Sequence, residues 1–227
     1  MLIKLEQVTK FYGRSQEILP VKAVDLTIER GEWVSVVGPS GCGKTTLLNL
    51  AGCLLRPASG RVLFEGIDTG TLKDGERTAL RNAKIGFVFQ GSYLLPTLTV
   101  VENVLAPVLF NRSLTKVEKR EKREESENLL AELGLGDRLH SLPYELSLGQ
   151  RRRAAVARAL INKPVILLAD EPTNDLDPIR ADQIAAILEE LNHKGLTILM
   201  VTHHPELAAR AERQYKLNQG KLEPAAL

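Results

Sequence analysis

Cysteine is scarce in this sequence: its 227 residues include two, Cys42 and Cys53. Two cysteines do not make the disulfide framework of a small secreted domain, so a reducing cytosol is the expected compartment. Long apolar runs are missing too, because no stretch approaches the roughly 20 apolar residues that span a bilayer. The first apolar run contains Lys4 and Glu6, which argues against a secretory signal. We expect a soluble chain whose membrane role, if any, depends on a partner.

An excess of charge of one sign is absent as well. The 30 basic and 28 acidic residues leave a formal net charge of +2. This balance gives no general attraction to nucleic acid or anionic lipid, and we predict no nucleic-acid partner. The chain is 44% hydrophobic, and its length suffices for one sizeable α/β domain with a small helical insertion.

Short apolar runs alternate with helical patterns along the chain. Segments 2–8 and 24–28 alternate apolar and polar residues, as half-buried antiparallel strands do. Buried strands that alternate with helices predict a mostly parallel sheet, whose ligands bind at the carboxyl ends of the strands. The segment 94–143 breaks this alternation and is predicted to be helical. The other predicted elements are strands at 33–37, 61–65, 85–89, 165–169 and 196–201 and helices at 44–51, 149–161 and 181–191.

A glycine-rich segment follows the first buried strand and fits the phosphate-binding pattern G-x-x-x-x-G-K-[ST] in full. Its glycines let backbone N–H groups converge on phosphate oxygens, and the helix that follows adds positive potential. Lys44 is predicted to reach the β- and γ-phosphates, and Thr45 to offer its hydroxyl to Mg²⁺. The predicted ATP-binding residues here are Gly38, Pro39, Ser40, Gly41, Cys42, Gly43, Lys44, Thr45 and Thr46.

This pattern alone does not identify the reaction. A GTPase would need an Asn-Lys-x-Asp element, and the segment 162–165 has Val165 where that aspartate should stand. A small-molecule kinase would need an acceptor pocket and a lid, for which the sequence gives no distinct signal. Both classes are therefore disfavoured.

Two adjacent carboxylates, Asp170 and Glu171, end another buried strand. Asp170 suits the magnesium shell, where a carboxylate acts directly or through water. Glu171 is then placed to orient the attacking water or to accept its proton. Two acids after a strand could instead cap the next helix, but the phosphate-binding segment favours the catalytic interpretation.

With these motifs the chain resembles the ATP-binding cassette family of transporter ATPases over almost its whole length. The segment Leu146–Gln150 is similar to the family signature L-S-G-G-Q, and it precedes Arg158-Ala-Leu160 and the Asp170-Glu171 pair at the family's spacing. The resemblance implies a P-loop NTPase core with a mostly parallel sheet, an antiparallel β subdomain at the N-terminal side and a helical signature subdomain. It implies one domain, 1–227, with the core at about 1–93 and 160–227 and the helical part at about 94–159.

The resemblance also assigns roles by position. Tyr12 matches the aromatic residue that stacks on adenine, and Gln90 matches the glutamine that contacts Mg²⁺ and signals to the membrane partner. His203 matches the histidine that senses the γ-phosphate, and the loop 174–177, with Asp177, matches the one that meets the opposite subunit. Lys44, Glu171 and His203 are thus the expected catalytic residues, with Thr45, Gln90 and Asp170 as magnesium ligands. Ser147, Leu148, Gly149 and Gln150 would act in trans on the nucleotide of a second copy.

Three details of these segments carry further expectations. Leu148 stands where the signature has its first glycine, so it should restrict the backbone and add bulk near the nucleotide, with closure weakened but retained. His204 is expected to face away from His203, because adjacent strand residues point to opposite faces. Arg151 to Arg153 are expected to be surface or interface charges rather than nucleic-acid contacts.

Within the family, the segments 85–90, 94–99 and 102–104 resemble the macrolide-export and lipoprotein-release branch, which pairs two ATPases with a permease. The implied location is the inner face of the cell membrane, in contact with that permease, and the cofactors are ATP and Mg²⁺. Regulation of an envelope hydrolase through a permease-like partner, or service to an amino-acid-type importer, are alternatives. DNA-repair ATPases are rejected, since they insert long coiled coils before the signature and this chain has no sustained heptads.

Overall fold

The computed structural model describes residues 1–13, 18–109 and 115–225. The alternating N-terminal segments form an antiparallel sheet in the order β2-β1-β4-β5. Its strands place one apolar face inward, where Ile3, Leu5 and Val8 are buried. The bounds of these strands are β1 Ile3–Tyr12, β2 Ile18–Ile28, β4 Ser59–Phe64 and β5 Ile67–Asp68.

The second sheet has six strands in the order β10-β9-β3-β8-β7-β6. Its strands are parallel except β10, which returns from β9 as an antiparallel hairpin. β7 and β8 are buried along their whole length, as expected for central strands covered on both faces. The bounds are β3 Trp33–Val37, β6 Ile85–Val88, β7 Ile166–Asp170, β8 Thr197–Thr202, β9 Arg213–Asn218 and β10 Lys221–Pro224.

The register of the second sheet brings three strand ends together. Val37 pairs with Thr202, and Asp170 pairs with Val201, so β3, β7 and β8 end at one edge. The glycine-rich segment follows β3, Glu171 follows β7 and His203 follows β8. These three pieces of the chain are therefore neighbours, although they are far apart in the sequence.

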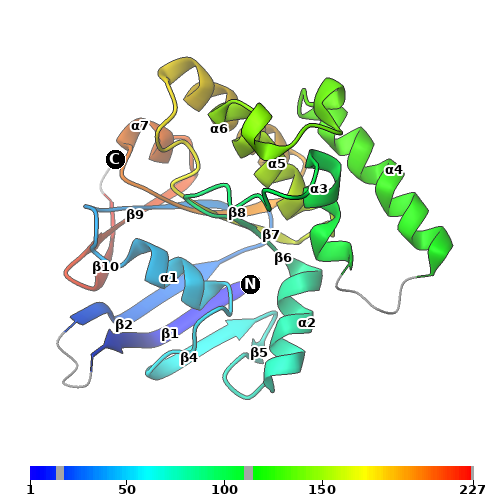
Figure 1. Ribbon diagram of the computed structural model, residues 1–227. Helices are drawn as coiled ribbons and strands as arrows, with labels where there is room; N and C mark the ends of the chain where they lie inside the picture. The colour runs from blue at the N-terminus through cyan, green and yellow to red at the C-terminus, as the bar shows by residue number, and fades with distance from the viewer. Residues whose placement is uncertain (14–17, 110–114, 226–227) are drawn as a thin grey trace.

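Helices cover both faces of the second sheet (Figure 1). α1 (Lys44–Ala51) lies between the two sheets and contributes Leu47, Leu48 and Leu50 to their common core. The opposite face is covered by α5 (Leu148–Leu160), α6 (Pro178–His193) and the short α7 (Pro205–Ala208). α2 (Asp74–Lys84) packs near β6.

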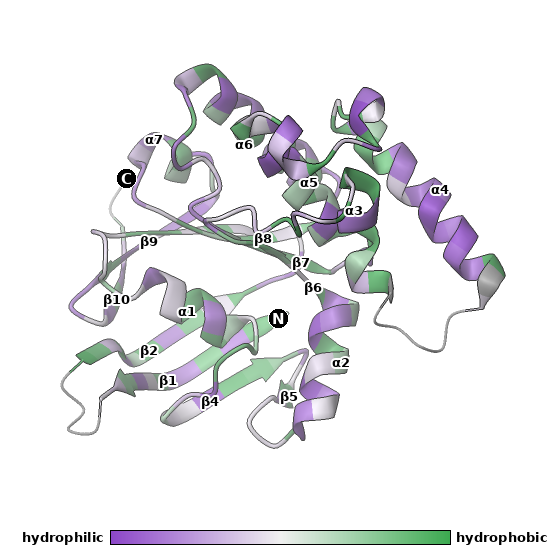
Figure 2. Ribbon diagram, viewed as in Figure 1, coloured by the Kyte–Doolittle hydropathy of each residue, from purple (hydrophilic) through white to green (hydrophobic). Residues whose placement is uncertain are grey.

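The segment predicted to be helical holds α3 (Val100–Leu109), α4 (Lys116–Glu132) and two 3-10 turns, Gly136–Arg138 and Pro143–Glu145. The N-terminus of α4 is capped by Thr115, whose N–H donates to Glu118 at 2.7 Å while its hydroxyl accepts from the Glu118 N–H at 3.3 Å. Most of α4 is hydrophilic (Figure 2). Arg120 and Arg123 pair with acids one turn further along this helix. Among the described helices, none is long and apolar enough to cross a bilayer.

Candidate active site

The shared strand ends open into a cleft of about 640 Å³. It gathers most of the residues that the sequence predicts for nucleotide binding. Its lining consists of Tyr12, Ile18, Pro20, Pro39, Ser40, Gly41, Gly43, Lys44, Thr45, Thr46, Gln90, Glu171, Asn174 and His203. Gly38, Cys42 and Asp170 are not in this lining. The cleft is therefore built from the antiparallel sheet, the glycine-rich segment and the ends of β6, β7 and β8.

Two glycines shape the loop that crosses the floor of the cleft. Gly41 has a φ of 77° and Gly43 one of 110°, a backbone region that favours glycine. Gly43 has a second constraint, because a Cβ there would lie 2.2 Å from the carbonyl oxygen of Pro20. Gly43 is also the N-cap of α1 and provides no side-chain cap, so the first N–H groups of the helix are left to face the cleft. This geometry suits an anion such as a phosphate group.

Lys44 is the buried cation of the cleft, with a side chain that is 7% exposed. Its ammonium donates to the carbonyls of Gly38, at 2.8 Å, and Pro39, at 3.1 Å. It also lies 3.3 Å from Oε1 of Glu171. A positive charge thus stands between the glycine-rich loop and the end of β7.

Glu171 also forms a hydrogen-bonded pair with His203 in the cleft. Oε2 of Glu171 lies 2.9 Å from Nδ1 of His203 and accepts from the His203 backbone N–H at 3.0 Å. Burial acts to raise the pKa of Glu171, but the bonds from His203 and the charge of Lys44 outweigh it and hold that pKa below its usual value. The carboxyl is therefore ionised at neutral pH, as a base that orients water must be.

The backbone of Glu171 is in the left-handed region, with a φ of 45°. A residue other than glycine pays a conformational cost there, and such residues gather at functional sites. The Glu171 N–H donates to the Val201 carbonyl at 2.9 Å, which fixes this turn against β8. The turn aims the carboxylate at Lys44 and His203.

Asp170 lies just behind the cleft, in the last position of β7, and is 4% exposed. Burial raises the pKa of Asp170; a bond from Thr45 and the charges of Lys44 and Arg152 act against that rise, while the charge of Glu171 adds to it. Its Oδ1 is buried and has no hydrogen-bond partner among the described residues. A buried, partnerless carboxylate oxygen beside a threonine hydroxyl is a donor set that fits a divalent cation such as Mg²⁺.

Cys42 and Gly38 support the loop from below. The Cys42 side chain is half-buried and packs against the core shared by the two sheets. A Cβ on Gly38 would lie 2.7 Å from Cys42 Sγ and 2.5 Å from the Leu217 carbonyl oxygen. These two predicted binding residues therefore shape the loop rather than line the cleft.

The predicted signature residues lie at the start of α5, away from the cleft of their own chain. Ser147 is the exposed N-cap of this helix, and it exchanges backbone and side-chain hydrogen bonds with Gln150 at 2.8 and 3.3 Å. Gly149 is buried, and a Cβ there would lie 3.2 Å from Arg180. Asp177 caps α6 by accepting from the Arg180 N–H at 3.0 Å.

Leu148 does not strain the helix that it begins. It is the first residue of α5 and is absent from the positive-φ residues of the described chain. A helical residue needs no glycine, so the leucine fits the fold of the single chain. Its expected effect on closure against a second copy stays a prediction. Its side chain lines a separate groove with Tyr93 and Tyr144.

The family model for ABC transporters matches residues 21–174, which is more than half of the chain. The chain belongs to the ABC transporter family. Its members are ATP-binding cassettes, ATPases coupled to transport.

Individual relatives cover the chain almost completely. The lipoprotein-releasing system ATP-binding protein LolD of Aquifex aeolicus is 44% identical over 97% of this chain and 96% of that protein. The macrolide export ATP-binding/permease protein MacB of Hyphomonas neptunium is 44% identical over 97% of this chain and 34% of that protein. A dimeric, post-hydrolysis structure of the ATP-binding cassette MJ0796 bound to ADP and Pi matches with a TM-score of 0.87 at 40% identity, covering 100% of both chains.

Asp170→Asn is expected to raise the melting temperature of the cassette without nucleotide. A carboxyl whose pKa is raised on folding destabilises the fold fully above its folded pKa, and this cost declines as the pH falls from the folded pKa to the lower pKa of the unfolded chain. The amide removes this cost at neutral pH, and each kcal/mol relieved adds about 2–4 °C in a domain of this size. Magnesium and ATP together should then stabilise the parent far more than the variant, as measured by thermal unfolding.

Asp137→Asn is the matched control for this experiment, because Asp137 is 72% exposed and its one ion pair among the described residues is with Arg138. It should leave the melting temperature and its response to magnesium and ATP almost unchanged. A melting temperature for Asp170→Asn below that of the parent, without nucleotide, would contradict the assigned cost of burying Asp170.

The structure adds residues that the sequence did not point to. Ile18 and Pro20 of β2 complete the wall of the cleft beside Tyr12, and no motif marks them. Arg152 was expected at the surface with its neighbours, but it is 2% exposed. It donates to the carbonyls of Phe89, at 2.9 Å, and Asn174, at 3.2 Å. The physical reason is that a helix start presents consecutive residues to different sides, and this one faces the core.

The neighbouring histidines also differ from expectation. β8 ends at Thr202, so His203 and His204 lie beyond the strand and do not alternate between its faces. Their ring centroids are 4.0 Å apart, with an interplanar angle of 37°. His203 is the one whose ring nitrogen meets Glu171.

Proposed function

We propose that two copies of this chain bind two MgATP molecules head to tail and use their hydrolysis to drive a membrane permease. The observation that carries the proposal is the separation of Ser147 from Lys44's cleft within one chain. Ser147 and Leu148 stand at the start of α5 and line no part of that cleft. Ser147 is exposed, so it is accessible to a second copy of the chain. A signature that acts on phosphate must then act on the cleft of another copy. The dimeric structures of MJ0796 are consistent with this arrangement.

The chemistry of one composite site follows from the residues of the cleft. Tyr12, which is 40% exposed at the end of β1, offers a ring face to adenine. Lys44 and the N–H groups at the start of α1 bind the phosphates and offset charge that develops on the γ-phosphoryl group. Thr45, Gln90 and Asp170 would hold Mg²⁺, which supplies further positive charge there.

Glu171 orients the attacking water in this account, and His203 fixes the carboxylate. The pair is set 2.9 Å apart, and Lys44 holds the other carboxylate oxygen. Ser147 and Gly149 of the second copy complete the contacts of the γ-phosphate. ATP therefore binds the closed dimer more tightly than the open one, and this difference in affinity is what moves the permease.

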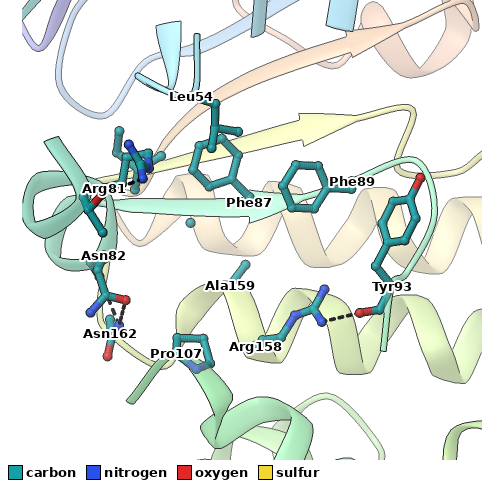
Figure 3. A pocket seen from close by; sticks show the side chains of 13 residues that line it. Leu54, Arg81, Asn82, Phe87, Phe89, Tyr93, Pro107, Arg158, Ala159 and Asn162 are labelled. Carbon is teal, nitrogen blue, oxygen red and sulfur yellow. Dashed lines mark hydrogen bonds between the residues drawn. The ribbon is translucent and has the colours of Figure 1, made fainter. Parts of the chain in front are cut away.

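A second hollow, of about 580 Å³, provides a docking surface for the permease. Phe87, Phe89 and Leu54 form its apolar wall, and the stacked rings of Phe87 and Phe89 are 5.5 Å apart (Figure 3). Tyr93 lies beside this wall, on the segment that carries Gln90. An apolar segment of the permease in this hollow would touch the Gln90 segment directly, which links the membrane partner to the nucleotide.

We assign the permease to the macrolide-export or lipoprotein-release type. The relatives LolD and MacB support this branch over an importer or a regulator of an envelope hydrolase. MacB carries a cassette and a permease in one protein, and this chain spans 34% of it. The cassette would then sit at the cytoplasmic face of the membrane, attached through its permease.

Leu54→Glu tests the docking surface. Leu54 is 39% exposed on the apolar wall, so a carboxylate there would remain solvated in the free cassette but would be buried against the permease. Co-purification of the permease should fall about 10-fold or more, since moving a carboxylate from water into an apolar contact costs well over 1.4 kcal/mol. Ile67→Glu is the control, because Ile67 is 50% exposed on β5 and does not line the hollow. Equal co-purification by both variants would refute the docking surface.

A further inference from the structure

Arg152 is a buried cation that joins three functional segments. It belongs to α5, five residues after Ser147, and is 2% exposed. One terminal nitrogen donates to the carbonyl of Phe89, the residue before Gln90, at 2.9 Å. The other donates to the carbonyl of Asn174, in the loop that follows Glu171, at 3.2 Å. The signature helix is thereby bonded to both sides of its own nucleotide cleft.

The surroundings of Arg152 favour a charged guanidinium with a positioning role. Burial lowers the pKa of Arg152, whereas the charges of Asp175 and Asp170 act to raise it, and a guanidinium stays protonated in proteins. Its Nε is buried and has no partner among the described residues. An apolar side chain would fill this part of the core without the free-energy cost of burying a charge. We therefore attribute the presence of the cation to its hydrogen bonds to Phe89 and Asn174.

A second arginine of the same helix holds the far side of Gln90. Arg158 donates to the carbonyl of Tyr93 at 2.7 Å (Figure 3). It also donates to the carbonyl of Ser92 at 2.8 Å. Tyr93 has a φ of 43°, which is unusual for a bulky residue and fixes a turn at this point. The segment between Phe89 and Tyr93 is therefore held by α5 at both ends.

The next arginine in the sequence provides a contrast. Arg153 donates to the carbonyls of Leu133, at 3.0 Å, and Gly134, at 3.5 Å. Both of these lie just after α4, so Arg153 makes its bonds within the helical segment alone. Arg152 and Arg153 share a helix and a bonding pattern, but only Arg152 reaches the nucleotide cleft.

We propose that Arg152 is a positioning residue that couples two movements of the chain. One is the approach of Gln90 to the magnesium of its own cleft, and the other is the placement of Ser147 against the nucleotide in the opposite cleft. A shift of Gln90 toward a bound Mg²⁺ moves Phe89, and Arg152 transmits that shift to α5. The second bond of Arg152, to the Asn174 carbonyl, carries movement of the Asn174 loop to the helix. The inference rests on the proposed dimer and adds to it a coupling between its two nucleotides within each chain.

The test uses a Glu171→Gln background and measures ATP-dependent dimerisation by analytical ultracentrifugation while magnesium is varied. Adding Arg152→Gln should raise the dimer dissociation constant about 10-fold or more, as the loss of a charge-assisted bond implies. The magnesium concentration for half-maximal dimerisation should rise as well. Arg153→Gln should change neither quantity, and Arg152→Lys, which keeps the charge and one bond at a time, should fall between.

Thermal unfolding separates positioning from mere stability. Both glutamine variants lose two hydrogen bonds and should lose thermal stability, but only Arg152→Gln should shift the magnesium dependence. Equal shifts for both variants, or none for Arg152→Gln, would overturn the inference. If Arg152→Gln does not fold, Arg152→Lys decides on the same criteria. If the Glu171→Gln protein stays monomeric with MgATP even without a change at Arg152, the proposed dimer is refuted. That result differs from one in which the dimer forms but the Arg152 variants do not alter it, which refutes the role of Arg152 alone.

Discussion

Glu171→Gln is expected to lower kcat for ATP about 10²–10⁴-fold, the usual contribution of a general base, and to leave a stable dimer with MgATP. The amide keeps the shape of the side chain, and its oxygen still accepts from the His203 N–H that lies 3.0 Å from the carboxylate. It cannot take a proton from water, so the γ-phosphate that joins the two copies stays in place. Single-turnover hydrolysis and size-exclusion chromatography with MgATP measure the two effects.

Glu190→Gln is the matched control, since Glu190 lies on α6 and, within the part of the chain that the structure describes, pairs with Lys194 alone, at 2.7 Å. It should hydrolyse ATP as the parent does. Normal turnover by Glu171→Gln, with only a monomer in MgATP, would show that Glu171 has been given the wrong role.

Lys44→Met is expected to weaken MgATP binding at least about 10-fold and to reduce hydrolysis about 10²–10³-fold, as removal of a charge-stabilising group at a reacting centre does. The methionine stem fills the same space but removes the ammonium that contacts Gly38, Pro39 and Glu171. The pKa of Glu171 should rise, because the charge of Lys44 is one of the causes that lower it. Equilibrium binding of a fluorescent ATP analogue and steady-state hydrolysis measure the loss.

Lys194→Met is the companion control, because Lys194 is exposed and Glu190 is its one ion-pair partner in residues 1–13, 18–109 and 115–225. Its binding and turnover should match the parent. If Lys44→Met binds MgATP within a factor of about two of the parent, the phosphates do not lie where they are placed here. The loss of a hydrogen bond to a charged group should weaken binding by more than that factor.

The fold was predictable wherever one pattern governed a segment. The strand 33–37 and the helix 44–51 have the bounds that the sequence predicts, because an apolar run ends in a glycine-rich turn and a helix begins at Lys44. β9 and β10 were not predicted. β9 places polar residues at most positions and is stabilised by pairing with β3, a tertiary contact that no local pattern reveals.

The sequence predicted which segments meet at the cleft, but not the geometry of their meeting. The glycine-rich segment, Asp170-Glu171 and His203 follow three strands, and the parallel register brings them to one edge. The left-handed turn at Glu171 and the burial of Arg152 depend on what surrounds them. Neither is encoded in the spacing of the motifs, because burial and turn direction are set by the packed core.

Site-directed crosslinking tests the composite site most directly. Ser40 lines the cleft, and Ser147 is the exposed cap of α5, so Ser40→Cys and Ser147→Cys mark the two halves. Both are introduced with Glu171→Gln into a chain whose Cys42 and Cys53 have been changed to serine. A short bifunctional thiol reagent should give a covalent dimer only with MgATP and only when both thiols are present. A failure to crosslink at saturating MgATP, with both thiols shown to react, would contradict the head-to-tail arrangement.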